Sequence, residues 1–106
     1  MPRFTLPDLA AIIDARAASE AENSYTRTLL DRGAEHCAKK MGEEAIETIM
    51  AALGDDRDHL IAESADLLFH FLVLLKARGV TLAEVEEVLG QRTAQSGLDE
   101  KASRPR

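Results

Sequence analysis

Acidic residues recur at helical spacing twice in the middle of the chain, first at Glu43, Glu44 and Glu47 and then at Glu63 and Asp66. Residues three or four positions apart share one face of a helix, so each group predicts an acidic helix face. Like charges at these spacings oppose helix formation by a few tenths of a kcal/mol per pair. A cation that prefers oxygen ligands removes this penalty, and Mg²⁺, which shares its shell between carboxylates, water and phosphate oxygens, is the candidate.

A solvated helix face is the alternative, because acids opposite an apolar stripe usually face water. The three glutamates of the first group leave that alternative open. The second group favours a site, since Asp66 directly precedes the apolar run 67–75 and the face of Glu63 and Asp66 continues into Leu67 and Leu74. A carboxylate on such a face needs a partner, because burying an unpaired charge is costly.

The elements that must position these acids are predicted to be helices. The chain has 106 residues, 45% of them hydrophobic, and is rich in Ala, Leu and Glu with few β-branched runs, which indicates one all-α domain. We expect a bundle of four to five helices in residues 1–92 and a polar tail at 93–106. The expected helices cover 4–18, a short turn before Gly33, 34–53, 57–77 and 81–92.

Capping residues indicate where two of these helices begin, and an apolar helix surface indicates the oligomeric state. Thr5 is a good N-cap, and Thr81 with Glu84 forms a capping box. The second half of the 57–77 helix is apolar nearly all round, more than three partner helices of a short chain can cover. We therefore expect a homodimer with this helix in the interface.

Charge and cysteine content narrow the function classes. The net charge of −6 disfavours nucleic-acid binding, and the apolar run 67–75 is too short to span a membrane. The N-terminus has no signal-peptide pattern. Cys37 is the single cysteine, expected to be a packed thiol in a reducing cytoplasm.

Several further residues have more than one interpretation. Gly42 costs roughly 1 kcal/mol against alanine inside a helix, which suggests close approach of a ligand or a helix, although a tolerated glycine is equally common. Arg16 either extends from the edge of the core or reaches the acidic site. His70 lies one turn after Asp66 and either orients it, contacts substrate, or is an ordinary packed histidine, as are the scattered His36 and His59.

The ordered motifs resemble the all-α nucleotide pyrophosphatases and, within that group, the phosphoribosyl-ATP pyrophosphatase family. Glu-x-x-Glu alone is a weak signal, whereas the ordered set is specific and covers nearly the whole chain. The set comprises Ile13-x-x-Arg16, Ser24-Tyr25-Thr26, Lys40-x-Gly42-Glu43-Glu44-x-x-Glu47, Glu63-x-x-Asp66-Leu67-Leu68-x-His70, Leu89-x-x-Arg92 and Ser96-Gly97-x-x-Glu100-Lys101-Ala102-x-Arg104.

This resemblance implies a specific activity. The family hydrolyses the α–β phosphoanhydride of phosphoribosyl-ATP to phosphoribosyl-AMP and pyrophosphate, in the second step of histidine biosynthesis, as an Mg²⁺-dependent homodimer. By position, Glu44, Glu47, Glu63 and Asp66 would hold the metal. Some relatives carry a fused cyclohydrolase domain, for which this chain is too short, so a single activity is expected.

The remaining roles follow from the chemistry of phosphoanhydride hydrolysis, which needs neutralised phosphates and a water held in line. Glu43 is a candidate to orient or deprotonate that water, or else it pairs with Lys40 or Lys39. Ser24, Tyr25 and Thr26 are candidates for phosphate or ribose contacts. The candidate phosphate-binding cations are Arg16, Lys40, Arg92, Lys101 and Arg104.

Three rival functions remain. The first is a related pyrophosphatase for ordinary or non-standard nucleoside triphosphates. The second, a di-iron carboxylate bundle, requires Glu-x-x-His on two helices, and the sequence contains none. The third is a non-catalytic helical dimerisation module whose acids are only solvated.

Overall fold

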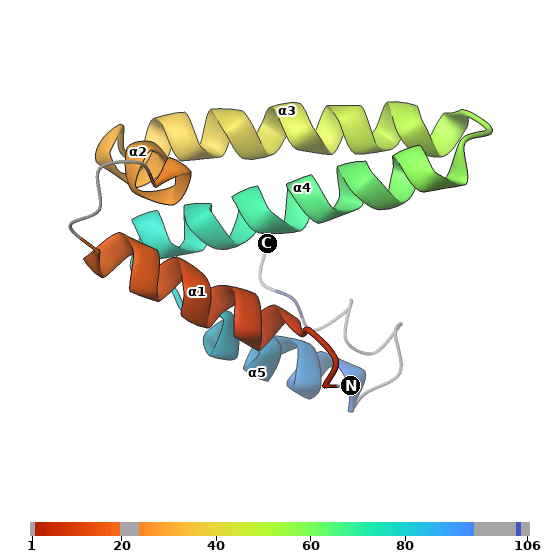
Figure 1. Ribbon diagram of the computed structural model, residues 1–106. Helices are drawn as coiled ribbons and strands as arrows, with labels where there is room; N and C mark the ends of the chain where they lie inside the picture. Colours follow the sequence, from red (N-terminus) through yellow and green to blue (C-terminus); the bar gives the residue numbers. More distant parts are fainter. Residues whose placement is uncertain (1, 20–23, 95–103, 105–106) are drawn as a thin grey trace.

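The computed structural model describes residues 2–19, 24–94 and 104, and this part of the chain is helical (Figure 1). The helices are α1 (Leu6–Ala18), α2 (Tyr25–Asp31), α3 (Ala34–Leu53), α4 (Arg57–Ala77) and α5 (Leu82–Thr93). The expected all-α class is therefore confirmed. Within the described ranges, no helix combines the length and the apolar character needed to cross a membrane.

Local side-chain contacts fix where the helices begin. Thr5 and Thr81 each form a capping box, with Asp8 and Glu84 respectively. The sequence predicts the box at Thr81, and at Thr5 it predicts the N-cap alone. The carboxylate of Asp56 accepts a hydrogen bond from the backbone N–H of His59 at the start of α4. These bonds satisfy amide groups that have no partner within the helix.

Helix α2 is longer than the sequence predicts. The sequence predicts only a short turn before Gly33, whereas Ser24 is the N-cap of a helix that begins with Tyr25 and Thr26. The Ser24 hydroxyl accepts a hydrogen bond from the backbone N–H of Arg27 at 3.2 Å. A serine that follows polar residues reads as a loop, and only its bond to Arg27 distinguishes it as a cap.

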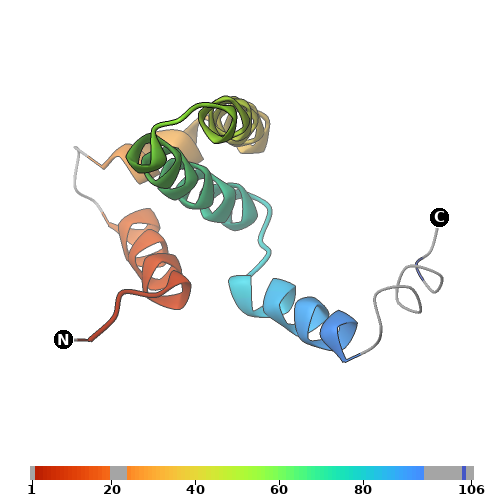
Figure 2. The same ribbon diagram turned by 90° about the vertical axis from the view of Figure 1, so that its right-hand side faces the viewer.

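Helices α3 and α4 form a long antiparallel hairpin, and α1 and α2 pack against α4 (Figures 1 and 2). The core lies where these helices meet and contains Ile13, Leu29, Cys37, Leu72 and Val73. The Cys37 thiol donates to the backbone oxygen of Leu29 at 3.2 Å, and burial raises its pKa. The interpretation of Cys37 as a packed thiol is confirmed.

The uncovered apolar surface is not where the sequence predicted it. The second half of α4 is largely covered within the chain, because Leu72 and Val73 are core residues and most of its other apolar residues pack around them, although Leu68 is exposed. The largest group of exposed hydrophobic side chains on one helix lies on α3, where Leu53 is 79% exposed. The exposed stripe on α3 comprises Ile46, Ile49, Met50 and Leu53.

Candidate functional site

Thr48 joins the two helices that carry the acidic residues. Its hydroxyl lies 2.8 Å from the backbone oxygen of Glu44 and 3.1 Å from that of Glu63. The second distance is a contact between α3 and α4, so the hydroxyl ties the two helices together about two turns from the connection between them. The acidic side of α3 therefore faces α4, and its apolar stripe faces solvent.

This packing brings carboxylates from both helices together. One carboxylate oxygen from each of Glu44, Glu63 and Asp66 lies within 4.8 Å of the other two. Glu47 contacts Glu44 and Glu63, because it is a hydrogen-bonding neighbour of both. The four acids that the sequence groups into two separate pairs thus occupy one place in the fold.

Two of these carboxyl groups are in an unfavourable environment. Burial and then the hydrogen bond and charge of Glu47 raise the pKa of Glu44. The hydrogen bond to Glu47, followed by burial, raises the pKa of Glu63, whose side chain is only 17% exposed. Each shift means that the charged form is destabilised by its surroundings.

The carboxylates have unused hydrogen-bonding capacity that suits a cation. The Oε2 atoms of Glu44 and Glu63 are buried, and neither has a partner among the described residues. A buried acceptor without a partner is costly. Oxygens on one Mg²⁺ stand at most about 4.2 Å apart, twice the bond length, so modest side-chain movements would close the cluster around an ion. An oxygen-only donor set with orphaned buried oxygens fits Mg²⁺.

A histidine and a tyrosine border the cluster. His70 Nδ1 lies 2.8 Å from the backbone oxygen of Asp66, which can only accept, so Nδ1 carries the proton. In the neutral ring, Nε2 then accepts from the Tyr25 hydroxyl at 3.1 Å. His70 is buried, and it holds the backbone of Asp66 rather than its carboxylate.

Glu43 stands apart from the four clustered acids. Its carboxylate pairs with Lys40 Nζ at 3.1 Å on the exposed side of α3, as one of the two sequence interpretations predicts. The hydrogen bond to Lys40 lowers the pKa of Glu43, and the same bond raises the pKa of Lys40. Tyr25 and Glu44 are also neighbours of Lys40, so this ion pair lies at the edge of the cluster.

The other predicted site residues lie on different elements. Arg16 and Arg92 are exposed on α1 and α5, whereas α3 and α4 build the cluster. Thr26 is 0% exposed, so its hydroxyl reaches no substrate in this conformation. Lys101 lies outside the described residues, and Arg104 is exposed.

Two residues that contact the site were not predicted from the sequence. The sequence also suggested that a helix or a ligand closely approaches Gly42, and no described helix does so. The missed residues are Thr48, described above, and His59, whose Nε2 lies 3.4 Å from Glu63 Oε1. Their spacing places both residues on the same helix faces as the acids, but solvent-exposed residues have the same spacing, so the pattern does not single them out. A Cβ added at Gly42 would meet no atom within 4 Å among its neighbours, so none of the described helices approaches it closely.

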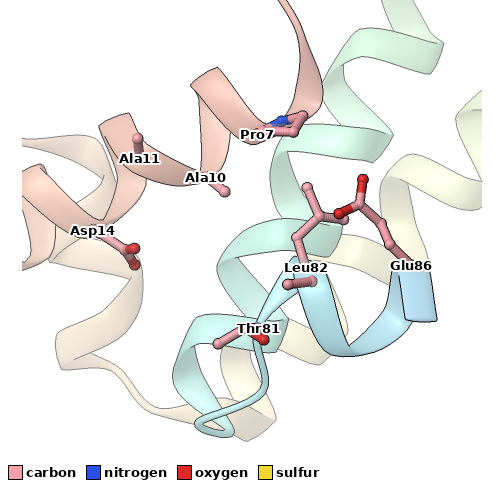
Figure 3. Close-up of a pocket in the computed structure, with 8 residues that line it drawn as sticks. Pro7, Ala10, Ala11, Asp14, Thr81, Leu82 and Glu86 are labelled. Atoms are coloured by element: carbon pink, nitrogen blue, oxygen red, sulfur yellow. The ribbon is translucent and has the colours of Figure 1, made fainter. Parts of the chain in front are cut away.

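Three hollows on the described part of the chain lie away from the cluster. Figure 3 shows one between α1 and α5, a cavity of about 290 Å³ lined by residues that include Ala10, Ala11 and Leu82. A second lies along α5 and includes Arg92, and a third is lined by Arg32, Glu35, His36 and Lys39 at the end of α2 and on α3. None of them contains a residue of the carboxylate cluster.

Comparison with known proteins assigns this arrangement to a family. Residues 6–93 match the model for phosphoribosyl-ATP pyrophosphohydrolase. The chain is 72% identical to a phosphoribosyl-ATP pyrophosphatase 1 of Bradyrhizobium diazoefficiens, over 98% of each protein. It is also 69% identical to the phosphoribosyl-ATP pyrophosphatase of Nitrobacter hamburgensis, over 100% of this chain and 99% of that protein. The matches confirm a hydrolase, and the chain belongs to the phosphoribosyl-ATP pyrophosphohydrolase family.

Proposed function

We propose that this chain hydrolyses the α–β phosphoanhydride of phosphoribosyl-ATP, giving phosphoribosyl-AMP and pyrophosphate in the second step of histidine biosynthesis. The names of its relatives support this substrate. The observation that carries the proposal is the carboxylate cluster of α3 and α4 with its two orphaned buried oxygens. The helical domain at 1–92 would carry the activity, in the cytoplasm.

The four clustered acids would hold Mg²⁺, which when bound neutralises charge on the phosphates. Side chains of the protein would bind the phosphates and position the attacking water. Lys40 would contact phosphate, and Glu43, one turn away on α3, would orient or deprotonate the attacking water. Outside this group, the residues proposed to assist binding are Arg16, Ser24, Tyr25, His70 and Arg92, with Lys101 and Arg104 of the 93–106 tail. Thr26 is not among them, because its side chain is 0% exposed.

Neutralising one acid of the cluster should abolish activity without unfolding the protein. Glu44→Gln keeps the side-chain shape but removes a charged oxygen ligand, and we expect pyrophosphate release to fall more than about 100-fold, since even residues outside the ligand set of metal sites commonly cost 10–100-fold. Glu87→Gln, an exposed acid on α5, is the matched control. Undiminished Mg²⁺-dependent turnover by Glu44→Gln would favour the non-catalytic dimerisation module.

The raised pKa values of Glu44 and Glu63 predict how stability depends on pH. Between about 4.5, their ordinary value, and the raised values, the folded protein binds more protons than the unfolded chain, so their contribution to stability falls as pH rises. In the absence of metal, Glu44→Gln should therefore melt increasingly above the wild type as pH rises from 4.5 to neutrality.

Added Mg²⁺ should remove this difference by raising the melting temperature of the wild type at neutral pH more than that of the variant. Differential scanning calorimetry at fixed protein concentration measures both effects. Parallel melting curves for the two proteins, with no response to Mg²⁺, would show that the carboxylates neither repel one another nor bind the ion.

Substrate preference tests the family-level alternative, a pyrophosphatase for ordinary nucleoside triphosphates. Pyrophosphate release should be measured from phosphoribosyl-ATP, ATP, dCTP and dUTP at equal concentrations. We expect kcat/KM to be highest for phosphoribosyl-ATP, because it alone carries the additional phosphoribosyl group that further side chains can bind. Preference for a simple triphosphate would overturn the proposed substrate while leaving the carboxylate chemistry intact.

We also propose that the chain is a homodimer, with the exposed stripe on α3 buried between subunits. Four large apolar side chains on one helix face form a patch of the kind that marks interaction surfaces. A two-fold interface would bury the same stripe on both copies. Helix α5, which contributes no buried residue, leaves further surface for a second subunit.

A charge placed in this stripe should dissociate the dimer. Ile49→Asp is expected to convert the protein to monomers at micromolar concentration, since a carboxylate buried in an apolar interface is costly. Ala15→Asp, the same charge at an exposed position of α1, is the control. Sedimentation equilibrium gives the masses, and a monomeric wild type, or an Ile49→Asp protein that remains dimeric, would contradict the proposed interface.

A further inference from the structure

Tyr25 is exposed and yet firmly held. Its residue is 53% exposed, although its hydroxyl bonds to His70 and its ring packs beside Phe69. The centroids of the Tyr25 and Phe69 rings are 6.1 Å apart with 18° between their planes, which is a stacked arrangement. Phe69 and His70 both contact the ring, and about half of the residue stays open to solvent.

The two residues that hold Tyr25 are themselves fixed. Phe69 packs against the core, and His70 is buried with its Nδ1–H donated to the backbone of Asp66. The Phe69 and His70 rings meet edge to face at 5.1 Å. Tyr25 therefore loses little conformational freedom when a flat molecule binds to it, and such preorganisation favours binding.

The position of Tyr25 relative to the cluster suits one part of a nucleotide. His70 links its hydroxyl to the turn of α4 that carries Asp66, and Lys40, paired with Glu43, lies near both Tyr25 and Glu44. A nucleotide whose phosphates lie at the carboxylates must extend its base away from them. An exposed aromatic ring bordering the cluster is a surface on which a base can stack.

We propose that the exposed face of Tyr25 is the subsite on which the purine base of the substrate stacks, which rests on the proposed nucleotide hydrolysis. Phe69 and His70 are positioning residues that hold the ring for this contact. This role differs from a hydrogen bond of the Tyr25 hydroxyl to phosphate or ribose, because that hydroxyl already donates to His70.

Fluorescence tests the stacking directly, since Tyr25 is the only tyrosine and the chain has no tryptophan. The full chain is titrated with AMP and, separately, with ribose 5-phosphate, which has the same phosphate and sugar but no base. We expect saturable quenching by AMP beyond that of free N-acetyltyrosinamide, and none by ribose 5-phosphate. Equal responses to both ligands, or no saturable response to millimolar AMP, would overturn the proposal.

Variants separate the ring from its hydroxyl. Tyr25→Leu removes the aromatic face and should raise KM for phosphoribosyl-ATP about tenfold or more with kcat much less affected, in line with the cost of losing a base–aromatic stack. Tyr25→Phe keeps the face and should lose less. Phe4→Leu, an exposed aromatic away from the cluster, controls for removal of a surface ring. A loss in Tyr25→Phe equal to that in Tyr25→Leu would assign the role to the hydroxyl and contradict stacking.

The two experiments fail independently of the proposed reaction. Quenching by AMP in a protein that does not hydrolyse phosphoribosyl-ATP would leave the base subsite standing and remove the proposed substrate. Normal turnover of phosphoribosyl-ATP by Tyr25→Leu would support the proposed substrate and refute the base subsite. If Tyr25 instead lies against a second subunit, AMP leaves its emission unchanged, and the base subsite is refuted.

Discussion

Mutual repulsion of carboxylates across the α3–α4 hairpin is the constraint on which the site depends. Glu44 and Glu63 have raised pKa values and buried oxygens without partners, so the fold holds these groups together against their electrostatic preference. The opposing contacts include the Thr48 hydroxyl, which ties α3 to the backbone of α4. Such tension is useful in a metal site, because a bound cation turns the repulsion between its ligands into affinity.

The same packing decides the outer surface of the protein. A helix turned with its acids toward its neighbour must turn its apolar stripe outward, and α3 does so at Ile46, Ile49, Met50 and Leu53. The proposed metal site and the proposed dimer are thus two consequences of one rotation of α3. Covering the stripe in a dimer would also hold α3 in the orientation that the metal needs.

Aromatic contacts at the end of the cluster connect the core to the site. Phe69 is anchored among core residues, His70 binds the backbone of Asp66, and Tyr25 rests on both. A change in this corner would therefore alter the proposed base subsite and the turn of α4 that carries one of the proposed metal ligands. Substitutions at Phe69 or His70 are expected to change both base binding and metal binding.

The sequence alone determined the long helices, most of their caps and the acidic helix faces, because these depend on spacing and on contacts within four residues. Thr5 and Thr81 are examples, since their partners lie three residues away. Tertiary structure decided which way α3 faces, where the exposed apolar stripe lies, and that Glu43 pairs with Lys40 rather than joining the cluster. Periodicity gives the faces of a helix but not the neighbour that each face meets, and only packing between distant segments chooses that neighbour.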